Sequence, residues 1–480
     1  MIKGFGLENF KAFRDPVFLN FKKINVFVGP NSSGKSSYIK GLLALQETLR
    51  TQEATPALHL SERIGDFRSI VYGKKPDGKI KISMEFRGGK GFSQSNERFG
   101  NSATDPYIEL IAEYLYMFSI THFATKYGTE NPAQEINATG PVIPFLNNPV
   151  VGVEIVVGEE GPKKPNRVET LVLKFKSLDT CKIARGMNGV GVFFNDKLEI
   201  SDATNFLAPY KLIFRPNLSN IDNLTITERK KILPAWIGLA MLEKQVGEFI
   251  QSIIHLEPFR NEPKRSEMVA NFQFGSVGSK GEGVLTNLIG LQETDGEDTQ
   301  QKTQWRDDIN HWLNEFHLAE SVDFTELGNN NYSMMIKNKN TGIPSSIVDV
   351  GVGTSQLLPI IVESVISPAG SLLLIEEPET HIHPNAQSKL GELFVKCSQK
   401  YEKSFIIETH SMYLVRQLQI LAAKGELKPE DVGIYYFEQN QDGTHVKDLE
   451  LMANGQFKEE FPKGFFDVPL SLSRTLMEFM

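Results

Sequence analysis

The chain has 480 residues, of which 40% are hydrophobic and 23% charged, a composition typical of a soluble globular protein with a sizeable core. Its net charge of −8 and scattered basic residues argue against an autonomous nucleic-acid binder, which usually presents a basic face. Cys181 and Cys397 are far apart and lack a Cys-x-x-Cys partner, which argues against a disulfide framework or a zinc cluster. The apolar runs are too short to span a membrane and the N-terminus lacks a signal-peptide pattern, so we expect a cytoplasmic protein.

A loop rich in glycine and serine follows the first strand-like run. Residues 24–28 are apolar, as in a short buried strand, and residues 36–48 carry apolar side chains at helical spacing. The loop between them fits the P-loop spacing G-x-x-x-x-G-K-[ST], in which backbone N–H groups wrap a triphosphate. The predicted ATP-binding residues are Gly29, Pro30, Asn31, Ser32, Ser33, Gly34, Lys35, Ser36 and Ser37.

Two side chains of this loop have predicted chemical roles. We expect the Lys35 ammonium to reach the β- and γ-phosphates and the Ser36 hydroxyl to bind Mg²⁺. The predicted cofactors are therefore ATP and Mg²⁺.

The rest of the chain changes character in blocks. Strand-like runs dominate up to the helical pattern near residue 223, and strands with buried helices return at about residue 331. This predicts an α/β fold, a P-loop ATPase head in two sequence halves with a β-rich and a helical insertion between them. The predicted segments are residues 1–95 and 331–480 for the two halves, 96–222 for the β-rich insertion and 223–330 for the helical region.

A second glycine-rich segment, DVGVGTSQLLPI, precedes a helical run in the C-terminal half. Small residues at a helix N-terminus favour an anion site. One chain can cradle a triphosphate with its own P-loop, so this segment suggests a nucleotide held between two subunits, although a plain loop before a buried helix remains open. The candidate residues are Gly351, Gly353, Ser355 and Gln356.

An apolar run at residues 372–375 ends in two carboxylates, Glu376 and Glu377. If it is a central strand, its end lies beside the P-loop, where open α/β sheets bind their ligands. We expect Glu376 to help hold Mg²⁺, directly or through water, and Glu377 to orient and deprotonate the water that attacks the γ-phosphate.

The run FIIETHS repeats this pattern, since an apolar strand ends in polar residues before a helix. His410 could hydrogen-bond the γ-phosphate or the attacking water, and we count it with Glu377 as a catalytic candidate. Capping or packing is the alternative role for a lone histidine at a strand end. His381 and His383 also lie beside acids, but no third ligand is evident for a metal site.

The motifs in this order resemble the ATPase heads of the ABC type in the SMC, RecF and OLD group. The amino-acid sequences of the motifs are most similar to those of the OLD-like ATPases identified as AAA_15 and AAA_21. The segments that carry this resemblance are LENFKAFRD, GPNSSGKSS, DVGVGTSQLLPI, LLIEEPETHIHP and ETHS. The segments IIHLEPFRNEPKR and GQFKEEFPKGFFD resemble members that contain DUF3696. No Toprim nuclease region is recognisable after His410, so we do not expect this chain to cut DNA by itself.

The resemblance implies residue roles by position. Residues 29–37 would bind ATP and Mg²⁺, Glu376 and Glu377 would be the Walker B acids, residues 351–356 the signature loop that acts on a partner's nucleotide, and His410 the switch histidine. The first Walker B position is usually Asp, so the longer Glu376 leaves a metal contact through water as the alternative to a direct one. No clear Gln marks a Q-loop.

The resemblance also implies a function and partners. We expect a homodimer or higher homo-oligomer joined by sandwiched ATP, which regulates an effector protein, a nuclease or a toxin, in bacterial anti-phage defence. The alternative is a RecF-like or SMC-like repair clamp that binds DNA directly, against which the net charge weighs. The sequence leaves open whether ATP activates or restrains the effector.

Overall fold

The computed structural model describes the following parts of the chain: residues 2–51, 57–58, 60–75, 78–87, 149–159, 165–186, 189–205, 207–216, 226–269, 274–292, 299–462, 464 and 474–477. Residues 96–148 of the predicted β-rich insertion lie outside the described residues. Contacts divide the chain into two compact units. The first comprises Met1–Asn20 and Lys40–Gln251, and the second comprises Phe21–Ile39 and Ser252–Met480.

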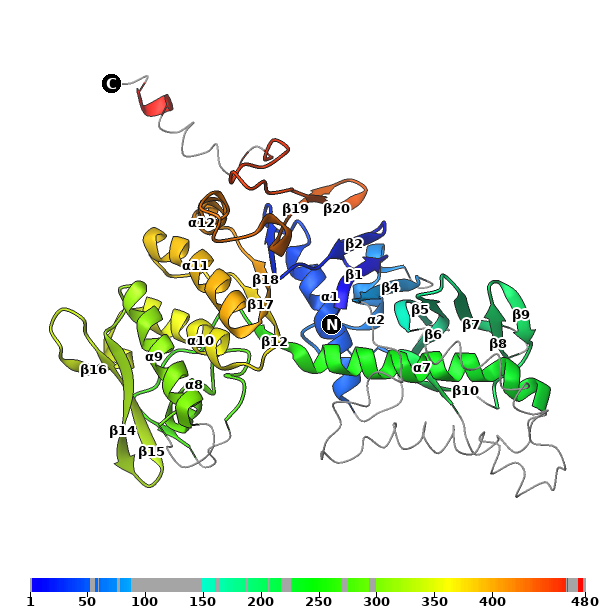
Figure 1. Cartoon of the computed structure of the whole chain (residues 1–480), viewed down its shortest axis with the longest axis horizontal. Helices are drawn as coiled ribbons and strands as arrows, with labels where there is room; N and C mark the ends of the chain where they lie inside the picture. Colours follow the sequence, from blue (N-terminus) through cyan, green and yellow to red (C-terminus); the bar gives the residue numbers. More distant parts are fainter. Residues whose placement is uncertain are drawn as a thin grey trace. The chain divides into compact units, whose positions relative to one another are not determined.

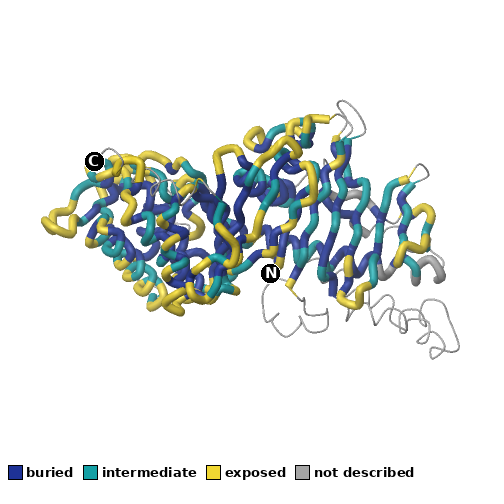
Figure 2. Tube along the Cα trace, turned by 90° about the horizontal axis from the view of Figure 1, so that it is seen from above, coloured by how far each residue is buried: buried dark blue, intermediate teal, exposed yellow. Residues whose placement is uncertain are grey.

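The first unit is built on an eight-stranded antiparallel sheet in the order β2-β1-β4-β5-β6-β7-β8-β9 (Figure 1). Buried and less buried residues alternate along several of its strands, as in a sheet with one covered face (Figure 2). The strands are β1 (Ile2–Glu8), β2 (Val17–Asn20), β4 (Ile80–Phe86), β5 (Val150–Glu159), β6 (Asn166–Phe175), β7 (Thr180–Gly186), β8 (Gly189–Phe194) and β9 (Lys197–Ile200).

The long helix α7 (Ile226–Ser252) packs on this sheet (Figure 1). A Cβ added to Gly238 would lie 2.8 Å from Leu173 on β6, and Gln245 donates a hydrogen bond to the Val150 carbonyl on β5. This unit also contains a hairpin of β10 (Leu207–Tyr210) and β11 (Ile213–Pro216), the short helix α2 (Phe67–Ile70) and the 3₁₀ turn η1 (Tyr72–Lys74).

The second unit is built on a six-stranded sheet in the order β12-β17-β18-β3-β19-β20, in which only β20 is antiparallel to its neighbour. Its strands are β3 (Ile24–Val28), β12 (Ile253–Leu256), β17 (Leu372–Glu376), β18 (Ser404–Glu408), β19 (Val432–Asn440) and β20 (Gly443–Asp448). Every residue of β3 and β17 is buried, as expected for parallel strands covered on both faces.

Three helices follow parallel strands of this sheet, and a fourth, α10, precedes β17. They are α1 (Lys35–Arg50), which starts in this unit and continues into the first, α10 (Val352–Ile366), α11 (Pro384–Tyr401) and α12 (Met412–Ala423). Helix α11 contacts α12, β18 and β3, and α10 contacts α11. Three-residue 3₁₀ turns precede α10 and β19, η5 (Ile347–Asp349) and η6 (Pro429–Asp431).

A smaller antiparallel sheet belongs to the same unit. It contains β13 (Glu267–Met268), β14 (Ser321–Gly328), β15 (Asn331–Lys337) and β16 (Pro344–Ser346), and helices α8 (Val284–Gly290) and α9 (Thr299–Glu315) contact β14. Ile309, Trp312 and Leu313 on α9 are buried in the core of this unit, together with residues of α10 and α11.

The α/β head predicted from two sequence halves is confirmed, because β3 and its P-loop insert into a sheet whose other strands come from the C-terminal half. The strands β5 to β9 do not form a separate sheet, since β4 pairs with β5 and continues the sheet of β1 and β2. The two units are not consecutive in the chain, so they do not test the four predicted segment boundaries, which stay a prediction.

Candidate nucleotide site

The P-loop follows β3, and its backbone requires glycine at two positions. Gly29 has φ +143°, and a Cβ there would lie 2.2 Å from the Phe437 carbonyl oxygen. Gly34 has φ +107°, and a Cβ there would lie 2.7 Å from Thr444 Oγ1. Such angles and contacts exclude any side chain without rearrangement. Thr444 also donates a 2.8 Å hydrogen bond to the Ser33 carbonyl and ties the loop to β20.

The other loop residues differ in exposure. Pro30, Asn31 and Ser32 are exposed, whereas Ser33 is buried and its hydroxyl has no hydrogen-bond partner among the described residues. Ser37 is partly exposed at the start of α1. The tip of the loop is therefore accessible while its base is fixed in the sheet.

Lys35 lies in the curl of this loop. Its side chain is buried, and Nζ donates hydrogen bonds of 3.0 Å to the Gly29 carbonyl and 2.8 Å to the Pro30 carbonyl. Burial lowers the pKa of Lys35, while the negative charges of Glu408 and Glu377 oppose that change. An ammonium held at this place can meet the phosphates that a P-loop cradles.

Parallel strand ends bring carboxylates to the same edge. Glu376 ends β17 and is opposite Glu408 at the end of β18, which in turn pairs with β3. The Ser36 hydroxyl donates a 2.8 Å hydrogen bond to Glu408 Oε1. Burial raises the pKa of Glu408 to about 7, and the charge of Glu376 adds to the effect. The sequence reasoning did not select Glu408, although its motif was recognised.

Glu376 faces another group. Its Oε1 lies 2.6 Å from His255 Nε2 at the end of β12, and both residues are buried. Its backbone carbonyl accepts a 2.9 Å hydrogen bond from Arg260 Nη2. Burial lowers the pKa of Arg260 to about 10, against the raising effect of the nearby carboxylates. His255 and Arg260 are site residues that the sequence reasoning missed, since β12 lies in a segment predicted to be helical.

Glu377 stands in a strained turn directly after the strand. Its φ is +44°, a left-handed conformation that costs free energy for a residue other than glycine. The Glu377 N–H donates to the Glu408 carbonyl at 2.8 Å, and the Glu377 carbonyl accepts from Thr380 N–H and Arg260 Nη1. These bonds fix the backbone, while the carboxylate stays partly exposed and accessible to water.

His410 follows β18 and faces the same edge. Its N–H donates to Glu379 Oε1, and the preceding Thr409 N–H donates to the Phe27 carbonyl on β3. Partial burial lowers the pKa of His410, and the positive charge of Lys35 lowers it further, whereas Glu377 opposes the shift. The charges of Lys35 and Glu377 therefore both act on His410.

The start of α10 is built differently. Gly351 is the N-cap, with no side-chain capping bond, and a Cβ added to Gly351 would have no heavy atom within 4 Å. A Cβ at Gly353 would make only ordinary contacts with the segment after β17. Ser355 Oγ donates to the Val352 carbonyl, and Gln356 is buried. Among the described residues, no hydrogen bond joins this segment to the P-loop.

The histidines after β17 have structural contacts. His383 is the N-cap of α11, and its Nδ1 accepts a hydrogen bond from Asn385 N–H. His381 has φ +64° and lines a pocket of about 270 Å³ beside Gly353. No cluster of three or more metal-ligating side chains occurs in the described part of the chain.

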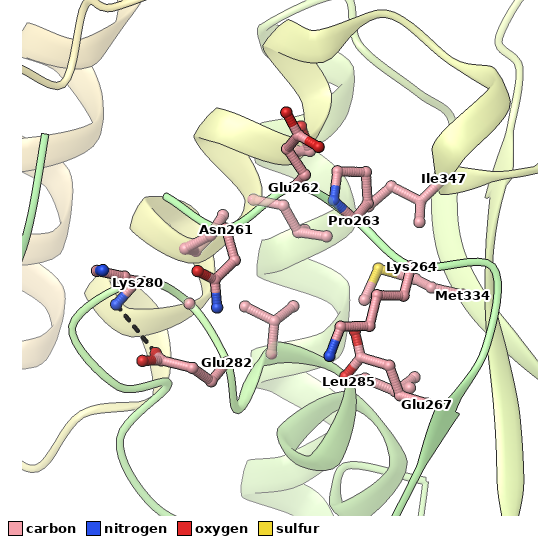
Figure 3. A pocket seen from close by; sticks show the side chains of 15 residues that line it. Asn261, Glu262, Pro263, Lys264, Glu267, Lys280, Glu282, Leu285, Met334 and Ile347 are labelled. Carbon is pink, nitrogen blue, oxygen red and sulfur yellow. Dashed lines mark hydrogen bonds between the residues drawn. The ribbon is translucent and has the colours of Figure 1, made fainter. Parts of the chain in front are cut away.

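A second pocket lies on the other side of α10, with a volume of about 130 Å³ (Figure 3). Its rim carries positively and negatively charged side chains, including Lys264, Lys280 and Glu282. The backbone N–H of Lys280 donates a hydrogen bond to Glu282 Oε2. Leu285 and Leu358 form part of an apolar floor. This volume is below the roughly 300 Å³ at which ligand pockets begin, so we do not assign the nucleotide to it.

The chain matches three family models in succession. An AAA ATPase domain (AAA_15) matches residues 1–139, an AAA domain described as a putative AbiEii toxin of a type IV toxin–antitoxin system (AAA_21) matches residues 247–416, and a protein of unknown function (DUF3696) matches residues 427–468. No curated protein matches the chain. None of the helices in the described ranges is long and apolar enough to cross a membrane.

Solved structures with similarity to the chain include SMC heads. The SMC head domain from Thermotoga maritima is 9% identical with a TM-score of 0.36, over 94% of this chain and 99% of that one. An Smc head domain with an extended coiled coil, bound to the C-terminal domain of ScpA and derived from Pyrococcus furiosus, is 10% identical with a TM-score of 0.37, over 99% and 98%. The fold of this chain is defined by the strand order of its sheets. The P-loop lies in the segment that the AAA_15 model matches and the acidic strand ends lie in the one that the AAA_21 model matches, so these matches support an ATPase and agree with the resemblance predicted from the sequence.

Proposed function

We propose that the chain is the ATP-binding and ATP-hydrolysing subunit of a regulatory assembly, in which nucleotide-driven dimerisation of the ABC type controls an effector protein. The observation that carries the proposal is a contrast within one unit. The P-loop edge holds a buried lysine, a hydroxyl and several carboxylates, whereas at the start of α10 Gly351 has open space around it and a Cβ at Gly353 would make only ordinary contacts. Such glycines can receive the nucleotide of a second copy.

The residues at the P-loop edge have defined tasks in this proposal. Lys35 and the loop N–H groups bind the phosphates, and Ser36 with a neighbouring carboxylate holds Mg²⁺. Bound Mg²⁺ would neutralise the charge that develops on the γ-phosphate. Glu377 accepts a proton from the attacking water, and backbone hydrogen bonds fix the turn that carries it. His410 reports the state of the γ-phosphate to α12, whose helix begins two residues later.

The partner is the second part of the proposal. Gly351 and Gly353 leave the α10 backbone accessible, and Val352 between them is 54% exposed. A helix N-terminus with bare backbone can approach a phosphate closely. We infer that Gly351, Gly353, Ser355 and Gln356 close on the nucleotide bound by a second copy of the chain.

A negative charge at Gly351 tests whether ATP is held between two copies of the chain. Gly351→Asp places a carboxylate where we expect the partner's triphosphate, so it should abolish ATP-dependent dimers while each monomer still binds ATP. Gly351→Asn is the matched control with the same shape and no charge. Sedimentation of the Glu377→Gln form with and without Mg-ATP gives the readout, and dimers that persist in Gly351→Asp would contradict the sandwich.

The proposal of an effector protein rests on family resemblance rather than on the geometry of the site. One matching model is described as a putative toxin of a toxin–antitoxin system, which fits a chain that acts with or against a toxin or nuclease. The net charge of −8 fits a protein partner better than DNA. We place this activity in the cytoplasm and in bacterial anti-phage defence.

The decisive experiment is an affinity purification of Glu377→Gln from its host, with Mg-ATP and then without nucleotide. A stoichiometric second protein that is retained only with ATP supports the regulatory subunit. DNA that copurifies without a second protein, and that salt removes steeply, supports the alternative of a RecF-like or SMC-like clamp.

A further inference from the structure

The carboxylate expected to hold the metal is engaged elsewhere. Glu376 is the last residue of β17, the strand expected to carry the Walker B acids, yet its Oε1 lies 2.6 Å from His255 Nε2 in a buried pair. Arg260 Nη2 holds the Glu376 carbonyl from the same side. This contact occupies one oxygen of Glu376, and β17 lies one strand further from the P-loop strand β3 than β18 does.

Glu408 has the contacts that a metal-binding carboxylate needs. It lies on β18, between the Walker B strand and the P-loop strand, and only 3% of its surface is exposed. Its Oε1 accepts the hydrogen bond from the Ser36 hydroxyl at 2.8 Å. Its Oε2 is buried, and no group in the described part of the chain is within hydrogen-bond distance of it.

An unpartnered oxygen of a buried carboxylate is costly, and such groups usually have a function. Hydroxyl and carboxylate oxygens are the donors that Mg²⁺ prefers, and Mg²⁺ in nucleotide sites uses few protein ligands besides phosphate and water. Ser36 and Glu408 provide that donor pair in direct contact with each other.

We propose that Glu408, rather than Glu376, is the carboxylate that holds the Mg²⁺ of bound nucleotide together with Ser36. Glu376 is then a positioning residue: with His255 and Arg260 it fixes the turn that carries Glu377. This assignment rests on the ATP site proposed above and changes which acid serves the metal there.

Metal binding, measured apart from hydrolysis, separates the two carboxylates. The full chain is loaded with a non-hydrolysable ATP analogue and titrated with Mn²⁺, whose bound and free forms electron paramagnetic resonance distinguishes. We expect Glu408→Gln to weaken Mn²⁺ binding about 10-fold or more, since metal-site carboxylates contribute at that scale. We expect Glu376→Gln to change Mn²⁺ binding by less than about 3-fold but to slow ATP hydrolysis.

The opposite pattern, or equal effects of the two variants, overturns the assignment. The amide oxygen of Gln can still accept the Ser36 hydrogen bond, so Glu408→Gln is the conservative variant. If it fails to fold, Glu408→Cys replaces it, and a shift in metal preference from Mn²⁺ to Cd²⁺ is expected because thiolates favour softer ions. An unchanged preference also overturns the assignment. A wild-type chain that binds no nucleotide would instead overturn the proposed function.

Discussion

The P-loop edge and the start of α10 both carry glycines, but only the first set is required by the chain's own packing. A side chain at Gly29 would collide with the Phe437 carbonyl, whereas one at Gly351 would meet nothing within 4 Å. The packing of the chain itself therefore requires glycine at position 29, whereas no packing contact requires it at position 351. In the proposed sandwich, each protomer contributes its P-loop edge to one nucleotide and the start of its α10 to the nucleotide of a second copy.

The two regions are also connected through the sheet. Helix α10 ends at Ile366, and Lys403, just before β18, donates hydrogen bonds to the Val365 carbonyl and to Ser367 Oγ. Strand β18 then runs to Glu408 and His410 at the P-loop edge. In the proposed dimer, a movement of α10 would reach the acids through Lys403 and β18.

The largest expected effect is at the P-loop. Lys35→Ala removes the buried ammonium inside the loop, so we expect nucleotide affinity to fall by about 100-fold or more, because charge-assisted bonds to phosphate are lost. Equilibrium binding of a fluorescent ATP analogue measures it. Lys40→Ala, one turn further along α1, is the matched control and should bind normally. Unchanged affinity in Lys35→Ala would remove the P-loop from the proposal.

The next effect separates binding from hydrolysis. Glu377→Gln keeps the shape of the side chain and the backbone bonds of the turn but loses the base, so we expect normal ATP binding and hydrolysis slower by about 10² or more. Single-turnover phosphate release is the measurement. Glu402→Gln, another glutamate at positive φ, is the control outside the site. Full activity of Glu377→Gln would move the role of base to another group.

The glycine contrast itself can be tested through stability. Gly29→Ala should lower the free energy of unfolding by about 3 kcal/mol or more, because of the backbone collision and the positive φ. Gly351→Ala, at φ −59° and with open space, should change it by less than about 0.5 kcal/mol. Urea denaturation of the two variants provides the comparison, and equal losses would show that the α10 start is packed after all.

The sequence allowed the sheet edge to be predicted but not its pairings. Apolar runs located β3, β17 and β18, and the rule that ligands bind at the carboxyl ends of parallel strands placed Lys35 and Glu377 together. The contact of Ser36 with Glu408 joins residues far apart in the chain, and nothing local specifies it. Long-range register is therefore what the sequence reasoning lacked.

Other differences have local causes. The four residues of β12 directly follow the 27-residue helix α7, so a short apolar run there reads as the end of the helix, and His255 was missed. The strands β5 and β6 were predicted as strands, but the pairing of β5 with β4 is non-local and was not. For the same reason, the contact between Glu376 and His255 was not predicted.

The smallest effect concerns Lys403, the link between the two regions. Burial lowers the pKa of Lys403 to about 8 from its usual 10.5, so the folded chain binds fewer protons than the unfolded chain between these values. The stability of the wild type should therefore rise with pH across this window, relative to Lys403→Met, which has no such group. We expect the variant to be more stable at pH 7, by on the order of 1–2 kcal/mol, and this advantage to shrink by pH 10.

Urea denaturation of both proteins across that pH range measures the difference in the free energy of unfolding. Lys424→Met, on the exposed end of α12, is the control that should show no pH-dependent difference. If the difference between wild type and Lys403→Met were constant with pH, the buried ammonium would not be under strain, and the link between α10 and β18 would be an ordinary hydrogen bond.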